Sequence, residues 1–323
     1  MAQERFLVTG AAGCIGAWVL RNLVRSGTPV TAFDLDTRLN RLPLLLGDAE
    51  IARIQFVQGD VSDYAAVEAA LKSSGARRIV HLAALQLPFC KADPVAGARV
   101  NVVGTVNLFE AAKRLGLKSL VYASSTAVYG TSEEYPEAPL AHDAPLKPHS
   151  HYGIYKQANE GTAQVYSRDD GVGSIGLRPY VVYGAGRDQG MTSTPTKAML
   201  AAAAGRPYKI SYGGRYCFQY GDDTARAFIQ AARADYAGAG VFNLGGESVS
   251  TPQVIAAIEQ AQPSARGTLT FDDVPLPFPP EVDNRALAEA VGPLHFTPLA
   301  DGVAETLDIF RCALADGRIK AEA

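Results

Sequence analysis

Tyr152 and Lys156 are the two residues whose types and spacing are best suited to chemistry. They lie four positions apart in Tyr152-Gly-Ile-Tyr155-Lys156, and residues at this spacing share one face of a helix. A phenol is a weak base at neutral pH, but a nearby ammonium favours the phenolate and lowers the phenol's pKa. The pair is therefore suited to taking a proton from a hydroxyl or returning one. On its own, the pattern also fits an exposed helix with an ordinary Tyr and Lys.

A glycine-rich turn near the start of the chain indicates a cofactor site. The apolar run 6–9 leads into Gly10, Gly13 and Gly16, and residues 17–25 are expected to form a helix. A strand, a turn and a helix start in this order bind pyrophosphate, because glycines let backbone N–H groups approach the phosphates. The first gap is one residue longer than in the common dinucleotide fingerprint. A glycine turn also serves as a plain strand-to-helix connection.

Two aspartates follow the next two expected strands. Asp34 ends the strand at 29–33 and comes eighteen residues after Gly16, where a carboxylate binds the ribose 2′-hydroxyl of NAD and repels the 2′-phosphate of NADP. Arg38 favours NADP, but we expect NAD. Asp60 follows the strand at 54–57 and either caps the helix that begins near Tyr64, contacts adenine, or does both.

Further candidates follow the fourth and fifth expected strands. Small residues in Leu82-Ala83-Ala84 would let the backbone lie against a dinucleotide, whereas 86–94 either flanks a substrate or is ordinary loop. The strand at 120–123 runs into the hydroxyl cluster Ser124-Ser125-Thr126, on the side of the sheet where open α/β folds bind ligands. Asn101 lies within the helix expected over 95–115, where an amide is unfavourable unless it holds a kinked backbone or an ordered water.

These motifs occur in one order, and together they resemble the extended short-chain dehydrogenase/reductase family, the group of NAD-dependent epimerases and dehydratases. The motifs are Gly10-x-x-Gly13-x-x-Gly16, Asp34, Asp60-Val61, His81-Leu-Ala-Ala84, Asn101, Ser124-Ser125 before Val128-Tyr129-Gly130, and Tyr152-x-x-x-Lys156. The likeness is strong over residues 1 to about 185 and weak thereafter.

The resemblance implies a role for each catalytic candidate. Tyr152 is the acid/base, Lys156 holds the nicotinamide ribose and lowers the pKa of the tyrosine, Ser125 is the active hydroxyl, and Asn101 supports the lysine through water. The predicted cofactor contacts are Gly10, Gly13, Cys14, Ile15, Gly16, Asp34, Asp60, Val61, Leu82, Ala83, Ala84, Asn101, Tyr152, Lys156 and Tyr180. The predicted substrate contacts are Ser125, Thr126, Arg187 and Arg215.

The chain departs from the family pattern at three places. Dehydratases carry an Asp-Glu pair where Thr126 and Ala127 stand, so dehydration is not expected. Sugar-nucleotide members usually carry Asn at Val181 and Arg-Asp-Phe at 216–218, where this chain has Tyr-Cys-Phe. These departures favour a smaller substrate than a nucleotide sugar, unless Arg187 and Arg215 rebuild the diphosphate site.

The composition narrows the class of protein. With 323 residues, 47% of them hydrophobic, and a net charge of −3, the chain can bury a large core, and nothing favours nucleic acid or a membrane surface as partner. Four widely spaced cysteines offer neither a disulfide framework nor a zinc site, so we expect no metal and a cytoplasmic location. The N-terminal apolar stretch is too interrupted for a signal peptide.

The expected architecture is α/β, a doubly wound parallel (Rossmann) sheet with a smaller C-terminal substrate lobe. Residues 1–177 would form the NAD-binding domain, with 218–244 returning to it, and residues 178–217 and 245–323 would form the lobe. In the family, helices corresponding to 95–115 and 151–166 pair across a two-fold axis, so a homodimer is expected.

The expected function is NAD-dependent hydride transfer at a secondary hydroxyl of a sugar-like small molecule, as an epimerase or a dehydrogenase. The substrate would be a non-nucleotide sugar, a sugar acid or a polyol. One alternative is a UDP-sugar 4-epimerase with a rebuilt diphosphate site. An alternative of another class is a non-catalytic dinucleotide-sensing protein, since a fold alone does not fix function.

Overall fold

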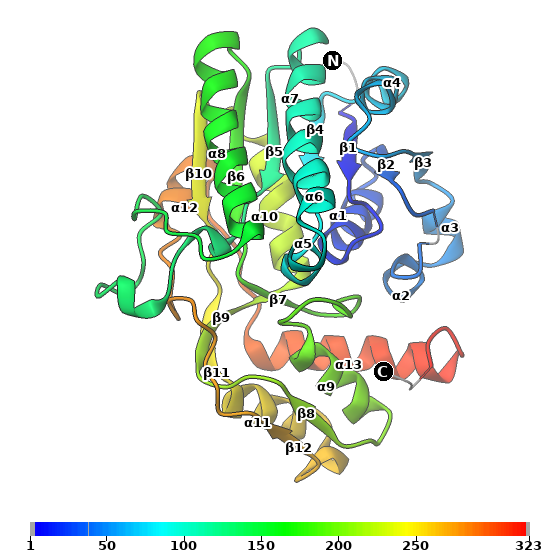
Figure 1. Ribbon diagram of the computed structural model, residues 1–323. Helices are drawn as coiled ribbons and strands as arrows, with labels where there is room; N and C mark the ends of the chain where they lie inside the picture. The colour runs from blue at the N-terminus through cyan, green and yellow to red at the C-terminus, as the bar shows by residue number, and fades with distance from the viewer. Residues whose placement is uncertain (1–3, 38, 321–323) are drawn as a thin grey trace.

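A computed structural model describes residues 4–37 and 39–320, and its central element is a seven-stranded parallel sheet (Figure 1). The strand order is β10-β6-β5-β4-β1-β2-β3. The strands are β1 (Phe6–Thr9), β2 (Val30–Asp34), β3 (Gln55–Gln58), β4 (Arg78–His81), β5 (Ser119–Ala123), β6 (Gly173–Arg178) and β10 (Ala239–Asn243). The order reverses between β1 and β4, and ligands bind outside the carboxyl ends of the strands at such a switch point. The predicted doubly wound sheet is confirmed.

Helices cover both faces of the sheet, so its inner strands are mostly buried on both sides, as is typical of parallel sheets, whereas the edge strand β3 is largely exposed. Helices α1 (Cys14–Arg25) and α10 (Gly221–Arg233) cover one face, and α4 (Tyr64–Ser74), α7 (Gly104–Arg114) and α8 (His151–Asp170) cover the other. Shorter helices lie in the connections: α2 (Leu42–Leu45), α3 (Asp48–Ile51), α5 (Leu87–Ala92), α6 (Pro94–Ala98) and α12 (Arg285–Val291). The expected helix over 95–115 is α6, a π-helical segment (Arg99–Val103) and α7.

A smaller lobe lies beyond the carboxyl ends of the strands, in the lower half of Figure 1. It contains a sheet of β7 (Val181–Tyr183), β9 (Arg215–Tyr220) and β11 (Glu247–Ser250), the pair β8 (Tyr208–Ile210) and β12 (Leu269–Phe271), and helices α9 (Thr194–Ala203), α11 (Thr251–Ala261) and α13 (Leu299–Ala315). Within residues 218–244, α10 and β10 lie on the large sheet, whereas β9 pairs in the small one.

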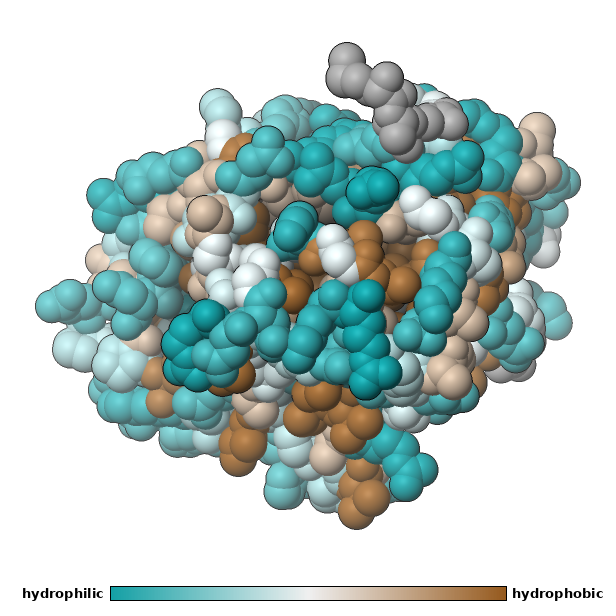
Figure 2. Space-filling model, turned by 90° about the horizontal axis from the view of Figure 1, so that it is seen from above, coloured by the Kyte–Doolittle hydropathy of each residue, from teal (hydrophilic) through white to brown (hydrophobic). Residues whose placement is uncertain are grey.

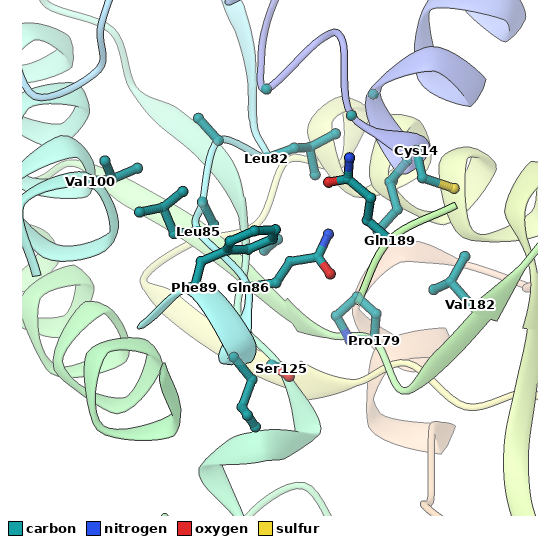
Figure 3. Close-up of a pocket in the computed structure, with 18 of the residues that line it drawn as sticks. Cys14, Leu82, Leu85, Gln86, Phe89, Val100, Ser125, Pro179, Val182 and Gln189 are labelled. Atoms are coloured by element: carbon teal, nitrogen blue, oxygen red, sulfur yellow. The ribbon is translucent and has the colours of Figure 1, made fainter. Parts of the chain in front are cut away.

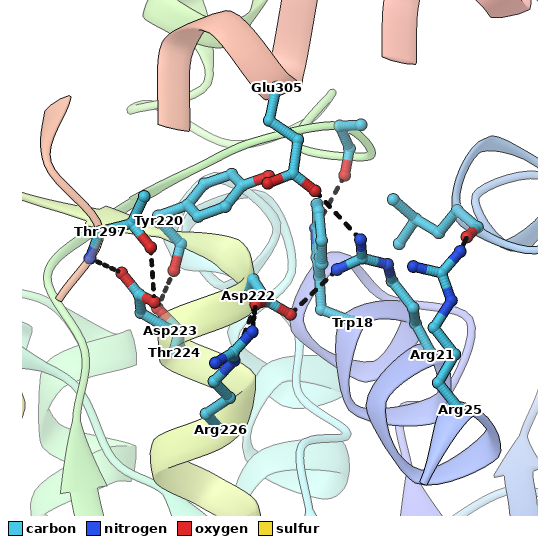
Figure 4. A network of polar contacts seen from close by, with 12 residues as sticks. Trp18, Arg21, Arg25, Tyr220, Asp222, Asp223, Thr224, Arg226, Thr297 and Glu305 are labelled. Carbon is cyan, nitrogen blue, oxygen red and sulfur yellow. Dashed lines mark hydrogen bonds and ion pairs between the residues drawn. The ribbon is translucent and has the colours of Figure 1, made fainter. Parts of the chain in front are cut away.

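Side chains of α1 join the sheet to the lobe (Figure 4). The Arg21 guanidinium bridges Asp222 of α10 and Glu305 of α13, with an N–O distance of 3.0 Å to each. Trp18 donates its indole N–H to the Ala185 carbonyl at 3.0 Å and packs edge-on against Tyr220. The helix that begins at the glycine turn therefore also fixes the start of the connection after β7.

The face opposite the lobe is a mixed and mostly hydrophilic surface (Figure 2). Within the described ranges 4–37 and 39–320, no helix has the length and hydrophobicity needed to cross a membrane. The same residues contain no cluster of three or more His, Cys, Asp or Glu side chains that could hold a metal ion.

Candidate active site

A cavity of about 600 Å³ opens at the carboxyl ends of β1, β2, β4 and β5, at the switch point of the sheet. Its walls come from the glycine turn, the segments that follow these strands, the start of α8 and the connection after β7. Figure 3 shows Cys14, Gln86, Ser125 and Gln189 around this cavity. Segments that are far apart in the sequence therefore meet at one site.

The glycine turn is shaped by close backbone approach. Gly10 has φ of +65°, and a Cβ on it would lie 2.5 Å from the Ala83 nitrogen. A Cβ on Gly16 would overlap the Gly10 carbonyl oxygen. Helix α1 begins at Cys14 directly after Gly13, so the free N–H groups of its first turn lie at the cavity wall, where a phosphate binds.

The predicted adenosine contacts also line this cavity. The Asp34 carboxylate accepts hydrogen bonds from the Ala12 N–H at 2.9 Å and the Asp36 N–H at 3.1 Å. Asp60 accepts from the Ser62 N–H at 2.8 Å, whereas the cap of α4 is Asp63. The capping role considered for Asp60 is therefore wrong. Arg38 lies outside the described residues.

The start of α8 brings Tyr152 and Lys156 together with Ser125. Ser150 caps α8, accepting from the Gly153 N–H at 3.1 Å. The Lys156 ammonium donates to the Ala123 carbonyl at 2.6 Å and lies 5.6 Å from the centre of the Tyr152 ring. The Tyr152 hydroxyl forms a hydrogen bond with the Ser125 side chain.

Burial has the largest effect on the pKa values of Tyr152 and Lys156. It raises the pKa of Tyr152, and the hydrogen bond to Ser125 and the charge of Arg187 oppose the shift only in part. It also lowers the pKa of Lys156 from 10.5 to about 8, because a buried ammonium loses its hydration. The charge that opposes burial is that of Arg187, so the lowering of the tyrosine pKa by Lys156 stays a prediction.

Asn101 has a different position from the one expected. It is buried in the π-helical segment, where its side chain accepts from the Leu85 N–H at 2.7 Å and donates to the Leu85 carbonyl at 2.9 Å. It does not line the cavity, and within residues 4–37 and 39–320 it forms no hydrogen bond with Lys156. The amide instead fixes the backbone after Leu82–Ala84, which does line the cavity.

The predicted substrate contacts divide into two groups. Ser125, Thr126 and Arg187 line the cavity, as does the predicted cofactor contact Tyr180, and Arg215 does not. The exposed Arg215 side chain donates to the Ser248 carbonyl at 2.8 Å, along the small sheet. Neighbouring residues of a strand point to opposite faces, and on β9 the inward residue is Tyr216.

Several cavity residues were not predicted from the sequence. They are Arg41, Gln86, Phe89, Gln189, Met191, Thr192 and Phe278. The segment 86–94 had been left open between substrate contact and loop, and its first residue reaches the cavity. The glycines around 184–190 were the only available signal for the connection after β7.

Arg41 ties that connection to the glycine turn. Its guanidinium donates to the Ala12 carbonyl at 2.8 Å, to the Gly186 carbonyl at 3.0 Å and to the Asp188 carboxylate at 2.6 Å. These contacts hold the mouth of the cavity together from both sides. No spacing rule in the sequence indicated this role.

A buried ion pair lies beneath the catalytic candidates. Glu160, one turn after Lys156, accepts two hydrogen bonds from Arg178 at 2.8 and 2.7 Å and a third from the Ser124 hydroxyl at 2.5 Å. Arg178 also donates to the Tyr129 hydroxyl at 2.5 Å. Lys156 and Glu160 thus join α8 to two successive residues at the end of β5, Ala123 and Ser124.

Known proteins resemble this chain over nearly its full length. Residues 6–245 match the model of the NAD-dependent epimerase/dehydratase family. A UDP-glucose 4-epimerase from Mycolicibacterium smegmatis is 33% identical over 95% of this chain and 98% of its own. The UDP-glucose 4-epimerase of Thermus thermophilus, solved in complex with NAD, has a TM-score of 0.79 and 27% identity, covering 96% of this chain and 100% of its own.

A dehydrogenase shares the same fold. L-Threonine dehydrogenase from Clostridium difficile has a TM-score of 0.83 at 21% identity, over 99% of this chain and 100% of its own. The glycine turn, Asp34 and the Ser125–Tyr152–Lys156 group fit the cofactor of the matching family, and the expected enzyme class and NAD dependence agree with it. This chain belongs to the NAD-dependent epimerase/dehydratase family, the extended short-chain dehydrogenase/reductase group.

Proposed function

We propose that this enzyme moves hydride between NAD and a secondary hydroxyl of a small, sugar-like substrate that carries no nucleotide. When bound, NAD supplies the hydride acceptor or donor. The Ser125 and Tyr152 hydroxyls would hold the reacting oxygen, and Tyr152 would accept or return its proton. Their mutual hydrogen bond at the cavity wall supports these roles.

The burial of the side chains at positions 181 and 216 is the observation that supports a substrate without a nucleotide. Val181 and Tyr216 are both 0% exposed, and Cys217 is 2% exposed. Tyr216 packs against Tyr212 and Phe218, and its hydroxyl lies 3.3 Å from the Thr251 hydroxyl. The positions where nucleotide-sugar members carry polar anchors therefore belong to the core here, and Arg215 does not replace them.

The remaining polar groups suit a polyhydroxylated molecule. Amides of Gln86 and Gln189 and hydroxyls of Thr126 and Thr192 line the cavity beyond Tyr152 and Ser125. Such groups pair with sugar hydroxyls as donors and acceptors. A diphosphate would need arginine forks or a helix N-terminus, and α1 offers its N-terminus to the cofactor.

Calorimetry with UDP and UDP-glucose tests the proposal on NAD-loaded enzyme. We expect dissociation constants no tighter than millimolar for both, while a panel of sugars, sugar acids and polyols yields NAD-dependent turnover. Micromolar binding of UDP, together with interconversion of UDP-sugars, would disprove it. Arg168→Gln, at an exposed residue paired with Asp169, is the control for the cavity variant Arg187→Ala, because it removes a positive charge outside the cavity.

A UDP-sugar 4-epimerase is the second candidate, favoured by the 33% identical relative of that name. An epimerase regenerates its cofactor within each cycle and need not release it, whereas a dehydrogenase must exchange NAD for NADH. The absorbance and mass of the purified enzyme show whether NAD is retained. UDP binding that is lost in Arg187→Ala but kept in Arg168→Gln would indicate a rebuilt diphosphate site.

We also propose a homodimer in the cytoplasm. The adjoining helices α6 and α8 carry the exposed apolar side chains Val95, Ile154 and Val165, and the π-helical segment after α6 adds Val103. A two-fold axis would bring the same patch of each copy together. The four cysteines are free thiols, which suits a reducing compartment.

A further inference from the structure

Arg187 is a cation in the cavity wall that has no anionic partner. It is adjacent to Asp188, but the Asp188 carboxylate is bound by Arg41 at 2.6 Å. One Arg187 amino group donates to the Thr192 hydroxyl at 3.0 Å. Its Nε is buried and lacks a hydrogen-bond partner, and no carboxylate forms an ion pair with Arg187 across residues 4–37 and 39–320.

Apart from Asp188, which is bound by Arg41, the acidic side chains of the cavity lie elsewhere. Asp34 and Asp60 follow β2 and β3, whereas Ser125 follows β5 and lies with Tyr152. Three strand spacings separate β5 from β2 in the sheet, a distance of about 14 Å. The cationic side chains of the lining are Lys156, Arg187 and Arg41, and Arg41 is paired with Asp188.

Arg187 acts on the reacting end of the cavity. Arg187 lines the same cavity as Tyr152 and Ser125, and its charge lowers the pKa of Tyr152 against the effect of burial. Lys156 already donates to the Ala123 carbonyl, whereas the Nε of Arg187 has no hydrogen-bond partner among the described residues. A half-buried guanidinium whose Nε is buried and unpaired gains from an anion that accepts its hydrogen bonds, and its planar fork matches the two oxygens of a carboxylate.

Building on the proposed function, we infer that the substrate is a hydroxy acid of the sugar-acid type, whose carboxylate is held by Arg187 beside the carbon that is oxidised. The acid's hydroxyl would then reach Ser125 and Tyr152 while Gln86 and Gln189 meet its other hydroxyls. The pyrophosphate of NAD would be the other oxyanion within the site, because Cys14 at the start of α1 lines the same cavity as Arg187.

Matched substrate pairs test the inference. Each pair is a four- to six-carbon sugar acid and the alcohol in which its carboxylate is reduced, beginning with gluconate and glucitol. We expect kcat/KM to be higher for the acid in a reactive pair. Arg187→Gln should lower kcat/KM for the acid by about 10- to 100-fold more than for the matching alcohol, since any effect through Tyr152 is common to both substrates. Arg187→Lys, which keeps the charge without the fork, should recover part of the loss, and Arg168→Gln should change neither.

Binding measurements separate the two oxyanions and need no turnover. The acid is titrated into NADH-loaded enzyme by calorimetry, and NAD is titrated into the empty enzyme. Arg187→Gln should weaken binding of the acid and leave the NAD dissociation constant within about threefold. A larger loss for NAD than for the acid would assign Arg187 to the pyrophosphate and overturn the inference.

Other outcomes are equally decisive. Turnover of alcohols in preference to acids, or no binding of any acid to the NADH-loaded enzyme, would overturn the carboxylate assignment and leave the proposed function standing. Turnover of UDP-sugars alone would overturn both the carboxylate assignment and the proposed function. Circular dichroism of each variant shows that a loss of binding is not a loss of fold.

Discussion

Tyr152 and Tyr155 belong to the same helix turn but contact different partners. Tyr152 hydrogen-bonds Ser125 in the cavity, whereas Tyr155 donates to the Pro94 carbonyl at 2.9 Å. We expect Tyr152→Phe to reduce kcat by about 10²–10⁴-fold, the usual contribution of a general acid or base, with unchanged NAD affinity. Tyr155→Phe is the matched control and should retain activity. Similar losses in both variants would contradict the assignment.

Lys156 gives stability a distinct dependence on pH. Its pKa is about 8 in the folded protein and 10.5 ordinarily, so between these values the unfolded chain binds more protons. The free energy of unfolding therefore receives a contribution that rises with pH across this window, and the penalty for the buried charge is complete below pH 8. Urea titrations at pH 7.5 and 9.5 should show wild type gaining stability relative to Lys156→Met. An equal response of both proteins would contradict the assignment.

At the scale of elements, α8 is held to the sheet by the Glu160–Arg178 pair. Both side chains are nearly inaccessible, so Glu160→Gln leaves a buried guanidinium without its counter-ion. Loss of one partner of such a pair costs about 3–5 kcal/mol, and urea unfolding measures it. The exposed pair Lys72–Glu68 of α4 is the control, since Glu68→Gln should cost no more than about 1 kcal/mol. A cost for Glu160→Gln as small as that would show that the pair does not hold α8.

The sequence was informative where one element carries its own signal. The glycine turn, Asp34 and the Tyr152/Lys156 spacing each depend on local geometry, and each could be assigned before the sheet was known. Arg215 and Arg41 could not. The direction in which the Arg215 side chain points depends on the register of β9 in a second sheet. The role of Arg41 depends on Asp188, a residue 147 positions away in the sequence.

The spacing of residues in the sequence also does not predict how deeply a side chain is buried. Helical spacing places Lys156 beside Tyr152, but whether the lysine or the loss of hydration sets the tyrosine pKa depends on how deeply the pair is enclosed. Asn101 illustrates the same limit. Its place in a strained part of the helix was predictable, and its partner Leu85 was not, because long-range hydrogen bonds follow from packing.

At the scale of the whole molecule, the apolar patch on α6 and α8 predicts the assembly. Light scattering at micromolar concentration should give about twice the 34.1 kDa of one chain. Ile154→Glu would bury a charge in the interface and should yield monomers. Val274→Glu, at an apolar residue of the lobe that is even more exposed than Ile154, should remain dimeric. A monomeric wild type would end this proposal.

The enclosed ring of Tyr216 also bears on how specificity can change during evolution. An arginine introduced there alone would place an unpaired charge among Tyr212, Phe218 and Thr251, at a cost of several kcal/mol against a total stability of about 5–15 kcal/mol. Tyr216→Arg should therefore melt well below Tyr216→Phe. Equal melting temperatures would show that the core tolerates the charge. During a change between nucleotide-free and nucleotide-carrying substrates, other substitutions would first have to make room for the arginine side chain and supply an anion to pair with it. The order in which substitutions occur would therefore decide whether the intermediate proteins stay folded.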